Sequence, residues 1–295
     1  KPKMKKAILF SKVSRQQSYF LNLRCFNSNV KHIKLDSIVH KPKSNSNKGM
    51  LVGLHGVFGS GRNWNQLGQK WCDNSGFEVH LLTARNHGES AKSNEMSFES
   101  MVADTVHYIE TNKQSNEKIF ILGHSLGGKT AMLLSLLYPK LIDKLIVVDI
   151  APINYSNISM HLNFVQAMNA LDLSQYKTRA EIDKALSVAI PDVVTRRFLL
   201  TNLTRNNDKS DSSSLFRWAG NIPLLAKPET LGELRDWPSQ ACAQRQFDKP
   251  TLFVRGGNSP YVSDESFQLA KQLYFPQASL ETIENTAHWV HAERP

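Results

Sequence analysis

The order of apolar and polar positions along this chain predicts strands that alternate with helices. Short, almost wholly apolar runs typical of buried strands are followed by turn residues and by stretches of helical period. Because these runs lack the in-out alternation of a half-exposed sheet, we expect an α/β fold with a mostly parallel sheet and helices on both faces. The expected strands are residues 50–56, 77–85, 118–123, 144–152, 250–257 and 278–285, and the expected helices include 97–111, 130–138 and 265–273.

Two segments depart from this alternation. Residues 31–40 alternate polar and apolar positions, which predicts a pair of more exposed strands at an edge of the sheet. From 153 to 239 the sequence shows only helical periodicity, and this stretch is far longer than one crossover needs. We therefore expect a helical lid at 153–239, inserted after the sixth strand between two parts of a core, 31–152 and 240–295.

A small polar group interrupts the apolar run KIFILGHSLGGKTAML at residues 118–133. Its centre, residues 123–127, matches G-x-S-x-G, a pattern in which the serine sits on a sharp bend from a strand into a helix. The spacing alone also fits a plain glycine-rich loop. Because a strand-like run precedes it and a helix-like run follows it, we interpret Ser125 as a nucleophile.

An activated serine of this kind needs two backbone N–H groups that stabilise the developing oxyanion. The residue after the nucleophile, Leu126, supplies one of them. The second is expected in the segment LHGVFGSGRNW, residues 54–64, where Val57 is the first choice and Phe58 the alternative. The order and distance of the two motifs favour this interpretation over a tight turn.

The general base should follow the last strand, because the triad of such enzymes runs Ser, Asp, His along the chain. His288 stands just after the strand expected at 278–285. His291 is the local alternative, three residues further on, where its side chain would face differently. Most of the ten histidines are better explained as surface or core residues.

The acid is harder to place, since Asn258 and Ser259 stand where an aspartate is expected after the strand at 250–257. We choose Asp149, which ends an apolar strand and is costly to bury without a partner. Both strand ends open onto the same edge of the sheet, so its carboxylate can reach the base. Asp264 and Asp236 are the alternatives.

Taken together, six segments resemble the alpha/beta-hydrolase domain-containing protein eleven group, which includes mitochondrial hydrolases and small bacterial acyl-CoA esterases. The segments are HGVFGSGRNW, ARNHGES, GHSLGGKTAM, VVDIAP, RGGNSPYV and AHWVHAERP. The resemblance implies an alpha/beta-hydrolase fold and an acid on the strand after the nucleophile helix, as at Asp149. FRWAGNI at 216–222 resembles the lid of the family, whereas Thr83 replaces an aspartate that relatives usually have. Candidates for the substrate pocket are Phe58, His124, Trp218 and Trp289.

Charge changes the picture only at the N-terminus. The net charge is +10, yet nine of the 36 Lys and Arg residues precede the first acidic residue, Asp36. The remainder is nearly neutral, which argues against a nucleic-acid partner. Residues 1–30 are basic and free of acids, as in a cleaved mitochondrial targeting segment, with plastid import or a solvated tail of a cytoplasmic protein as alternatives.

The predicted activity is therefore a serine esterase or thioesterase that acts on a small acyl ester or thioester. It implies no cofactor and no metal, since the three cysteines lack the spacing of metal ligands. No apolar run is long enough to span a membrane. An acyltransferase with the same triad is the main alternative, and a non-catalytic binding protein is a weaker one. A peptidase would call for an acidic cluster in the lid, which is not found.

Overall fold

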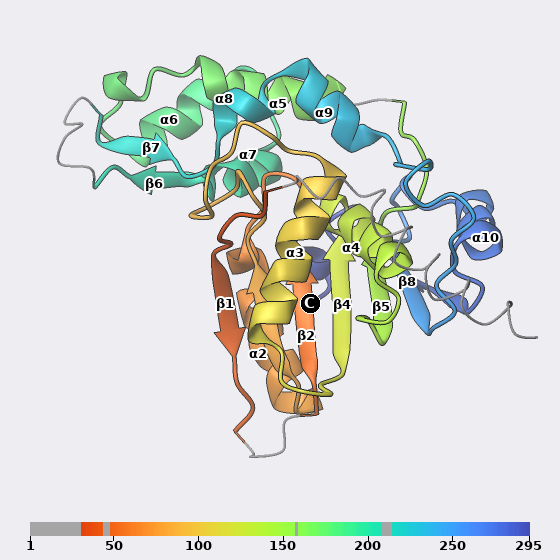
Figure 1. Ribbon diagram of the computed structural model, residues 1–295. Helices are drawn as coiled ribbons and strands as arrows, with labels where there is room; N and C mark the ends of the chain where they lie inside the picture. The colour runs from red at the N-terminus through yellow and green to blue at the C-terminus, as the bar shows by residue number, and fades with distance from the viewer. Residues whose placement is uncertain (1–30, 44–47, 157–158, 208–213) are drawn as a thin grey trace, which may run out of the picture. The chain divides into compact units, whose positions relative to one another are not determined.

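A seven-stranded sheet lies at the centre of the computed structural model, which describes residues 31–43, 48–156, 159–207 and 214–295 (Figure 1). Its order is β1-β3-β2-β4-β5-β8-β9, and every neighbouring pair is parallel except β1 with β3. The mostly parallel sheet expected from the apolar runs is confirmed. The strands are β1 (Ser37–His40), β2 (Met50–Leu54), β3 (Glu78–Leu82), β4 (Ile119–His124), β5 (Lys144–Val148), β8 (Thr251–Gly256) and β9 (Ala278–Ile283).

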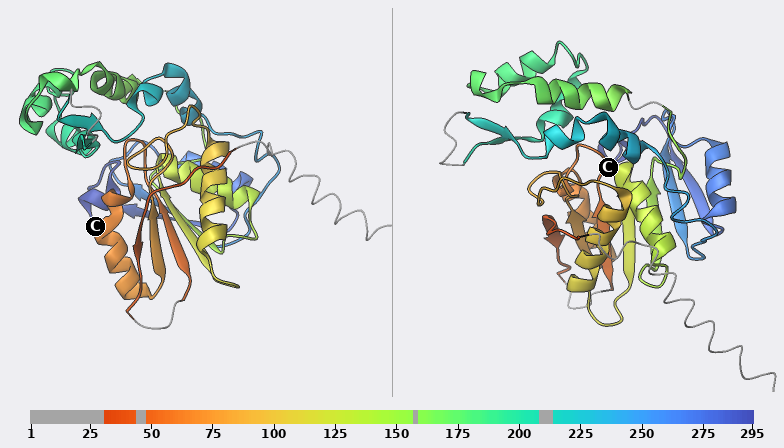
Figure 2. Two further views of the ribbon diagram at one scale, coloured as in Figure 1. Left: turned by 60° about the vertical axis from the view of Figure 1, so that its left-hand side comes forward. Right: turned by 45° about the horizontal axis from the view of Figure 1, so that its top comes forward.

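Helices cover both faces of the sheet. Helix α2 (Asn65–Ser75) packs on one face, and α3 (Phe98–Asn112) and α4 (Leu126–Leu137) pack on the other (Figure 2). Every residue of α4 is buried, because this helix lies between the sheet and α3. Helix α10 (Asp264–Leu273) joins β8 to β9, and α11 (Val290–Glu293) follows β9.

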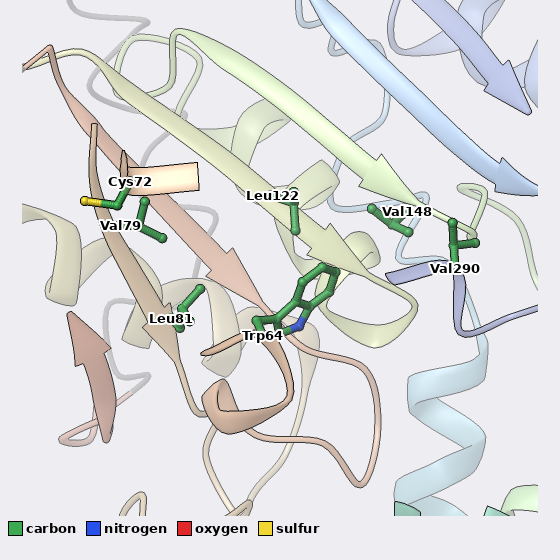
Figure 3. Packing of buried hydrophobic residues seen from close by; sticks show 7 residues of the cluster. All are labelled: Trp64, Cys72, Val79, Leu81, Leu122, Val148 and Val290. Atoms are coloured by element: carbon green, nitrogen blue, oxygen red, sulfur yellow. The ribbon is translucent and has the colours of Figure 1, made fainter. Parts of the chain in front are cut away.

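The α2 face of the sheet holds a cluster of buried apolar side chains (Figure 3). Val79 and Leu81 alternate along β3 and therefore point to the same face, where Leu122 of β4 joins them. Cys72 of α2 and Trp64 close the cluster, and Trp64 belongs to a short 3-10 helix, η2 (Gly61–Trp64). This packing fixes the loop after β2 against the sheet.

A long insertion separates β5 from β8, and Figure 1 shows it over the edge at which the parallel strands end. The insertion packs on the core through polar contacts. The Asn202 side chain donates to the carbonyl of Phe58 at 2.8 Å, and the Asn221 N–H donates to the carbonyl of Asn86 at 2.8 Å. Its elements are α5 (Ser159–Ala170), η3 (Leu173–Gln175), α6 (Arg179–Leu186), α7 (Val193–Leu200), β6 (Leu203–Arg205), β7 (Phe216–Trp218), α8 (Ile222–Leu225) and α9 (Pro228–Arg235).

Two sequence expectations need correction. The insertion is not wholly helical, because β6 and β7 pair as an antiparallel ribbon of three residues each. The insertion also follows the fifth strand of the described residues rather than the sixth, since residues 31–40 contribute one strand, β1, instead of two. The expected targeting segment at 1–30 lies outside the described residues.

Candidate active site

Ser125 stands on the bend between β4 and α4, with φ 52° and ψ −116°. This left-handed backbone is strained for a residue with a side chain, at a cost of about 1–3 kcal/mol. The flanking glycines leave room for the bend. A Cβ at Gly123 would lie 2.2 Å from the carbonyl oxygen of Gly127, and a Cβ at Gly127 would lie 2.3 Å from that of Leu54. The G-x-S-x-G motif therefore has the strand-turn-helix context that its chemistry needs.

Asp149 follows β5 and is fully buried, with a left-handed φ of 51°. Its carboxylate accepts three hydrogen bonds. Oδ1 accepts from the N–H of Gly256 at 3.0 Å, and Oδ2 accepts from the hydroxyl of Ser259 and from Nδ1 of His288 at 2.7 Å. These donors compensate a buried charge that would otherwise be very costly.

The alternative acids lie elsewhere. Asp264 begins α10, is exposed, and pairs with Arg255 at 2.6 Å. Asp236 pairs with its neighbour Arg235 at 2.9 Å. Neither is bonded to His288, so the structure brings Asp149 and not these two to the candidate base.

Sequence reasoning missed the role of Ser259. It stands in the turn where an aspartate was expected, and its hydroxyl donates to the carboxylate of Asp149 instead. The sequence did contain a signal for this role, because a hydroxyl stands where an acid was expected. If the acid lies instead on the neighbouring strand, its buried carboxylate needs extra donors, and Ser259 can supply one.

His288 lies in the loop between β9 and α11, where two contacts hold its ring and a third holds its backbone. Nδ1 donates to Asp149, so Nε2 is left as the acceptor of the neutral ring. Tyr261 stacks on the ring at a centroid distance of 4.1 Å. Nε2 of His124 donates to the His288 carbonyl at 2.9 Å, and burial lowers the pKa of His124 well below its usual value. This bond ties His124, the residue before Ser125, to the loop that carries His288.

His291, the sequence alternative, takes a different place. Its ring stacks on Trp64 at 4.0 Å, and it makes no hydrogen bond to Asp149. Burial is the main cause that lowers the pKa of His291 to about 4, and the neighbouring His288 adds a smaller effect in the same direction.

The loop after β2 lies directly beside Ser125. A Cβ at Gly56 would come within 3.3 Å of the Cβ of Ser125. The N–H groups of Val57 and Leu126 have no acceptor among the described residues. The N–H of Phe58, by contrast, donates to Nε2 of His87 at 3.2 Å. Because this bond occupies the N–H of Phe58, the N–H groups of Val57 and Leu126 are the pair that remains free, within the described part of the chain, to donate to a substrate.

Two neutral histidines hold this loop. Nδ1 of His55 donates to the carbonyl of Gly56 at 2.7 Å, and its Nε2 accepts from the N–H of Ala84 at 2.9 Å. Burial lowers the pKa of His55 to about 3 and that of His87 to about 4. Both rings therefore stay uncharged and can accept hydrogen bonds at neutral pH. Sequence reasoning assigned no role to either ring.

The loop after β3, which carries His87, is itself fixed by a buried ion pair. Arg85 donates to both carboxylate oxygens of Asp104, at 2.7 and 2.9 Å. Both side chains are almost completely buried. At Thr83, where the resemblance led us to expect an aspartate, the hydroxyl accepts from the N–H of Gly61 at 3.1 Å.

Two cavities meet at Ser125. The first cavity, of about 220 Å³, has His288 and a largely apolar wall that includes the candidates Phe58, His124 and Trp289. The second cavity, of about 70 Å³, has Leu126 in its wall. Val57, Ser125, His161 and Tyr261 line both. The expectation for Trp218 is wrong, since it lines neither cavity; it lies on β7 of the insertion, and its indole N–H donates to the carbonyl of Met168 at 3.1 Å.

Within the described residues, no three His, Cys, Asp or Glu side chains come together as a metal site. Cys72 and Cys242 are free and buried. In the same part of the chain, no helix is long and apolar enough to cross a membrane.

Comparisons with known proteins agree with this fold. A family model for the alpha/beta hydrolase fold matches residues 49–295. The chain is 36% identical over 249 residues to "sn-1-specific diacylglycerol lipase ABHD11" of Mus musculus, a match that covers 83% of this chain and 76% of the relative. It is 32% identical over 265 residues to "Esterase YbfF" of Escherichia coli, covering 89% and 95%.

Among solved structures, a "Marine microorganism esterase" superposes with a TM-score of 0.78 at 35% identity, covering 89% of this chain and 95% of that one. The chain therefore belongs to the alpha/beta hydrolase family, in the group that contains ABHD11 and small bacterial esterases.

Proposed function

We propose that this chain is a serine hydrolase that cleaves carboxylic ester or thioester bonds through an acyl-enzyme intermediate on Ser125. One observation carries the proposal. Ser125 and His288 line one cavity, and the ring of His288 is oriented by the buried carboxylate of Asp149. The esterase and lipase names of the relatives support the same reaction class.

In the acylation step, Oγ of Ser125 bonds to the carbonyl carbon while Nε2 of His288 takes the hydroxyl proton. The N–H groups of Val57 and Leu126 stabilise the oxyanion. His288 then gives its proton to the leaving oxygen or sulfur as the bond to that atom breaks. Asp149 keeps the ring oriented and stabilises the transient imidazolium.

Water completes the cycle. Nε2 of His288 takes a proton from a water molecule as the water oxygen bonds to the acyl carbon. His288 then returns a proton to Oγ of Ser125 as the acyl-enzyme bond breaks. The described residues provide each group that these steps need, so the proposed reaction requires no cofactor.

The insertion at 153–239 acts in this proposal as a lid on the core formed by 31–152 and 240–295. The support is its place over the ends of the strands and the contribution of Met160, His161, Phe164 and Phe198 to the first cavity. A largely apolar wall suits an apolar part of the substrate.

The basic segment 1–30 is proposed as a mitochondrial targeting signal, on composition alone. Fusing residues 1–30 to a fluorescent protein tests this proposal. Mitochondrial fluorescence would support it, and a diffuse signal would contradict it.

Hydrolysis of p-nitrophenyl butanoate by the Ser125→Ala variant tests the proposed function. We expect kcat to fall about 10⁴- to 10⁶-fold, as when a serine nucleophile is removed. Ser135→Ala is the control, since Ser135 is a buried serine of α4, the helix that follows Ser125, and its hydroxyl donates to the carbonyl of Ala131. Full activity of Ser125→Ala would refute the proposal. An excess of ester product when an alcohol is added would indicate acyl transfer instead of hydrolysis.

A further inference from the structure

Different parts of the insertion cover the two cavities that meet at Ser125. Helices α5 and α7 line the first cavity, with Phe164 and Leu199 among their contributions. Helix α9 lines the second through Leu231 and Leu234. His161 and Tyr261 stand at the boundary, because both line both cavities. A substrate bound at Ser125 therefore has two separate spaces for its two halves.

The chemistry of the leaving group assigns the first of these spaces. The leaving atom must take a proton from Nε2 of His288, which requires a separation of about 3 Å. His288 lines the first cavity and is not part of the wall of the second. The alcohol or thiol half of the substrate therefore extends into the first cavity.

The second cavity is then left for the acyl chain. In the tetrahedral intermediate, the central carbon carries Oγ of Ser125, the oxyanion, the leaving atom and the first carbon of the acyl chain. Leu126, one of the two donors, lines the second cavity and not the first. The oxyanion therefore lies between the two cavities, at Val57 and Leu126, and with the leaving group in the first cavity the second is the space left for the acyl chain.

The second cavity is also small, and a polar group held by hydrogen bonds forms part of its wall. Its volume is about 70 Å³, against about 220 Å³ for the first. Lys129 forms part of its wall, and its Nζ donates to the carbonyl of Ile153 at 3.0 Å and to that of Arg235. Nζ also lies 4.8 Å from the ring centroid of Tyr155. A long apolar chain would have to displace this buried amine from its partners, which is costly.

We propose that the second cavity is the acyl subsite and the first is the leaving-group subsite. The enzyme then selects esters or thioesters of short acyl chains and accepts a larger apolar alcohol or thiol. This inference rests on the proposed function, since it presumes that Ser125 is acylated.

Two matched variants test the assignment. Leu231→Ala enlarges the second cavity and Leu199→Ala enlarges the first. The two variants are matched because each replaces a buried leucine of an insertion helix with alanine. Each is assayed with p-nitrophenyl butanoate and octanoate, which vary the acyl chain, and with ethyl and decyl butanoate, which vary the leaving group. The melting temperature of each variant shows that it is folded, and Leu234→Ala replaces Leu231→Ala if the latter is not.

For the wild type, we expect kcat/KM to be about 10-fold or more lower for the octanoate than for the butanoate. Leu231→Ala should reduce this ratio at least about 5-fold and leave the preference between ethyl and decyl esters unchanged. Leu199→Ala should change the preference between alcohols and leave the preference between acyl chains within about twofold.

The reverse pattern, in which Leu199→Ala extends the range of acyl chains, would overturn the assignment while leaving the esterase activity intact. A wild type equally active on both acyl chains would overturn the selection for short chains. A folded wild type that cleaves none of these esters would instead count against the proposed function itself.

Discussion

At the scale of single residues, Asp149 and Ser125 share a left-handed backbone φ, and both stand at strand ends on the same edge of the sheet. Aspartate tolerates this conformation better than most residues. The bend turns its carboxylate toward Gly256, Ser259 and His288, whose donors hold it. These donors compensate the buried charge of Asp149, and its carboxylate in turn orients the candidate base.

The substitution Asp149→Asn tests this role. The amide keeps the size of the side chain but no longer favours the Nδ1–H tautomer of His288 or stabilises its charged form, so we expect kcat/KM to fall about 10³- to 10⁴-fold. Asp264→Asn is the control and should stay within about twofold, because an exposed ion pair contributes little. Hydrolysis of p-nitrophenyl butanoate measures both. More than a tenth of wild-type activity in Asp149→Asn would show that another group acts as the acid.

At the scale of elements, the loops after β2 and β3 form one unit. His87, from the loop after β3, holds the N–H of Phe58 in the loop after β2, next to the N–H of Val57. The ion pair of Arg85 with Asp104 ties the same unit to α3. The position of the Val57 N–H, the proposed oxyanion donor, therefore depends on a side chain that does not line either cavity.

Replacing His87 tests whether this support matters for catalysis. His87→Phe leaves the buried N–H of Phe58 without an acceptor, and we expect kcat to fall about 10- to 100-fold as the oxyanion donor shifts. His87→Gln keeps an acceptor oxygen and should lose less. Steady-state kinetics, with urea unfolding as a check on stability, separates the two. Equal kcat in His87→Phe and the wild type would mean that the loop holds its shape without this bond.

The sequence predicts some elements better than others for physical reasons. Wholly apolar strands and the G-x-S-x-G bend have local signals, so β2, β4 and α4 could be expected. The ribbon of β6 and β7 has three residues in each strand, too few to show a period. The roles of Ser259 and His87 depend on partners far along the chain, which no local pattern reveals.

At the scale of the whole described unit, parallel strand order brings distant residues together. The carboxyl ends of β4 and β5 and the loop after β9 meet at one edge, so His124 contacts the carbonyl of His288 across 164 positions. The same edge buries His55, His87 and His124 in neutral form, with pKa values lowered by burial. The stability of the fold is thereby coupled to pH.

The free energy of unfolding should respond to acid in a defined window. Between pH 6.5 and about 4, the unfolded chain protonates His55 and His87 while the folded chain does not. The lowered pKa of His124 acts in the same direction. The contribution of these rings to the free energy of unfolding should therefore be constant above pH 6.5. It should fall as the pH drops from 6.5 toward 4, by up to about 1.4 kcal/mol per pH unit for each ring. Urea unfolding at pH 7.5, 6, 5 and 4.5 measures it. In His87→Gln the fall should be shallower, and an identical slope would show that His87 does not contribute.

The central claim is that Ser125 is an activated nucleophile, and reaction with a fluorophosphonate followed by mass spectrometry tests it most directly. We expect one adduct per chain, on the peptide that contains Ser125, and none in Ser125→Ala. The adduct should form much more slowly in Asp149→Asn, since orientation of His288 is lost. A folded wild type that stays unlabelled, or carries its label on another residue, would contradict the account.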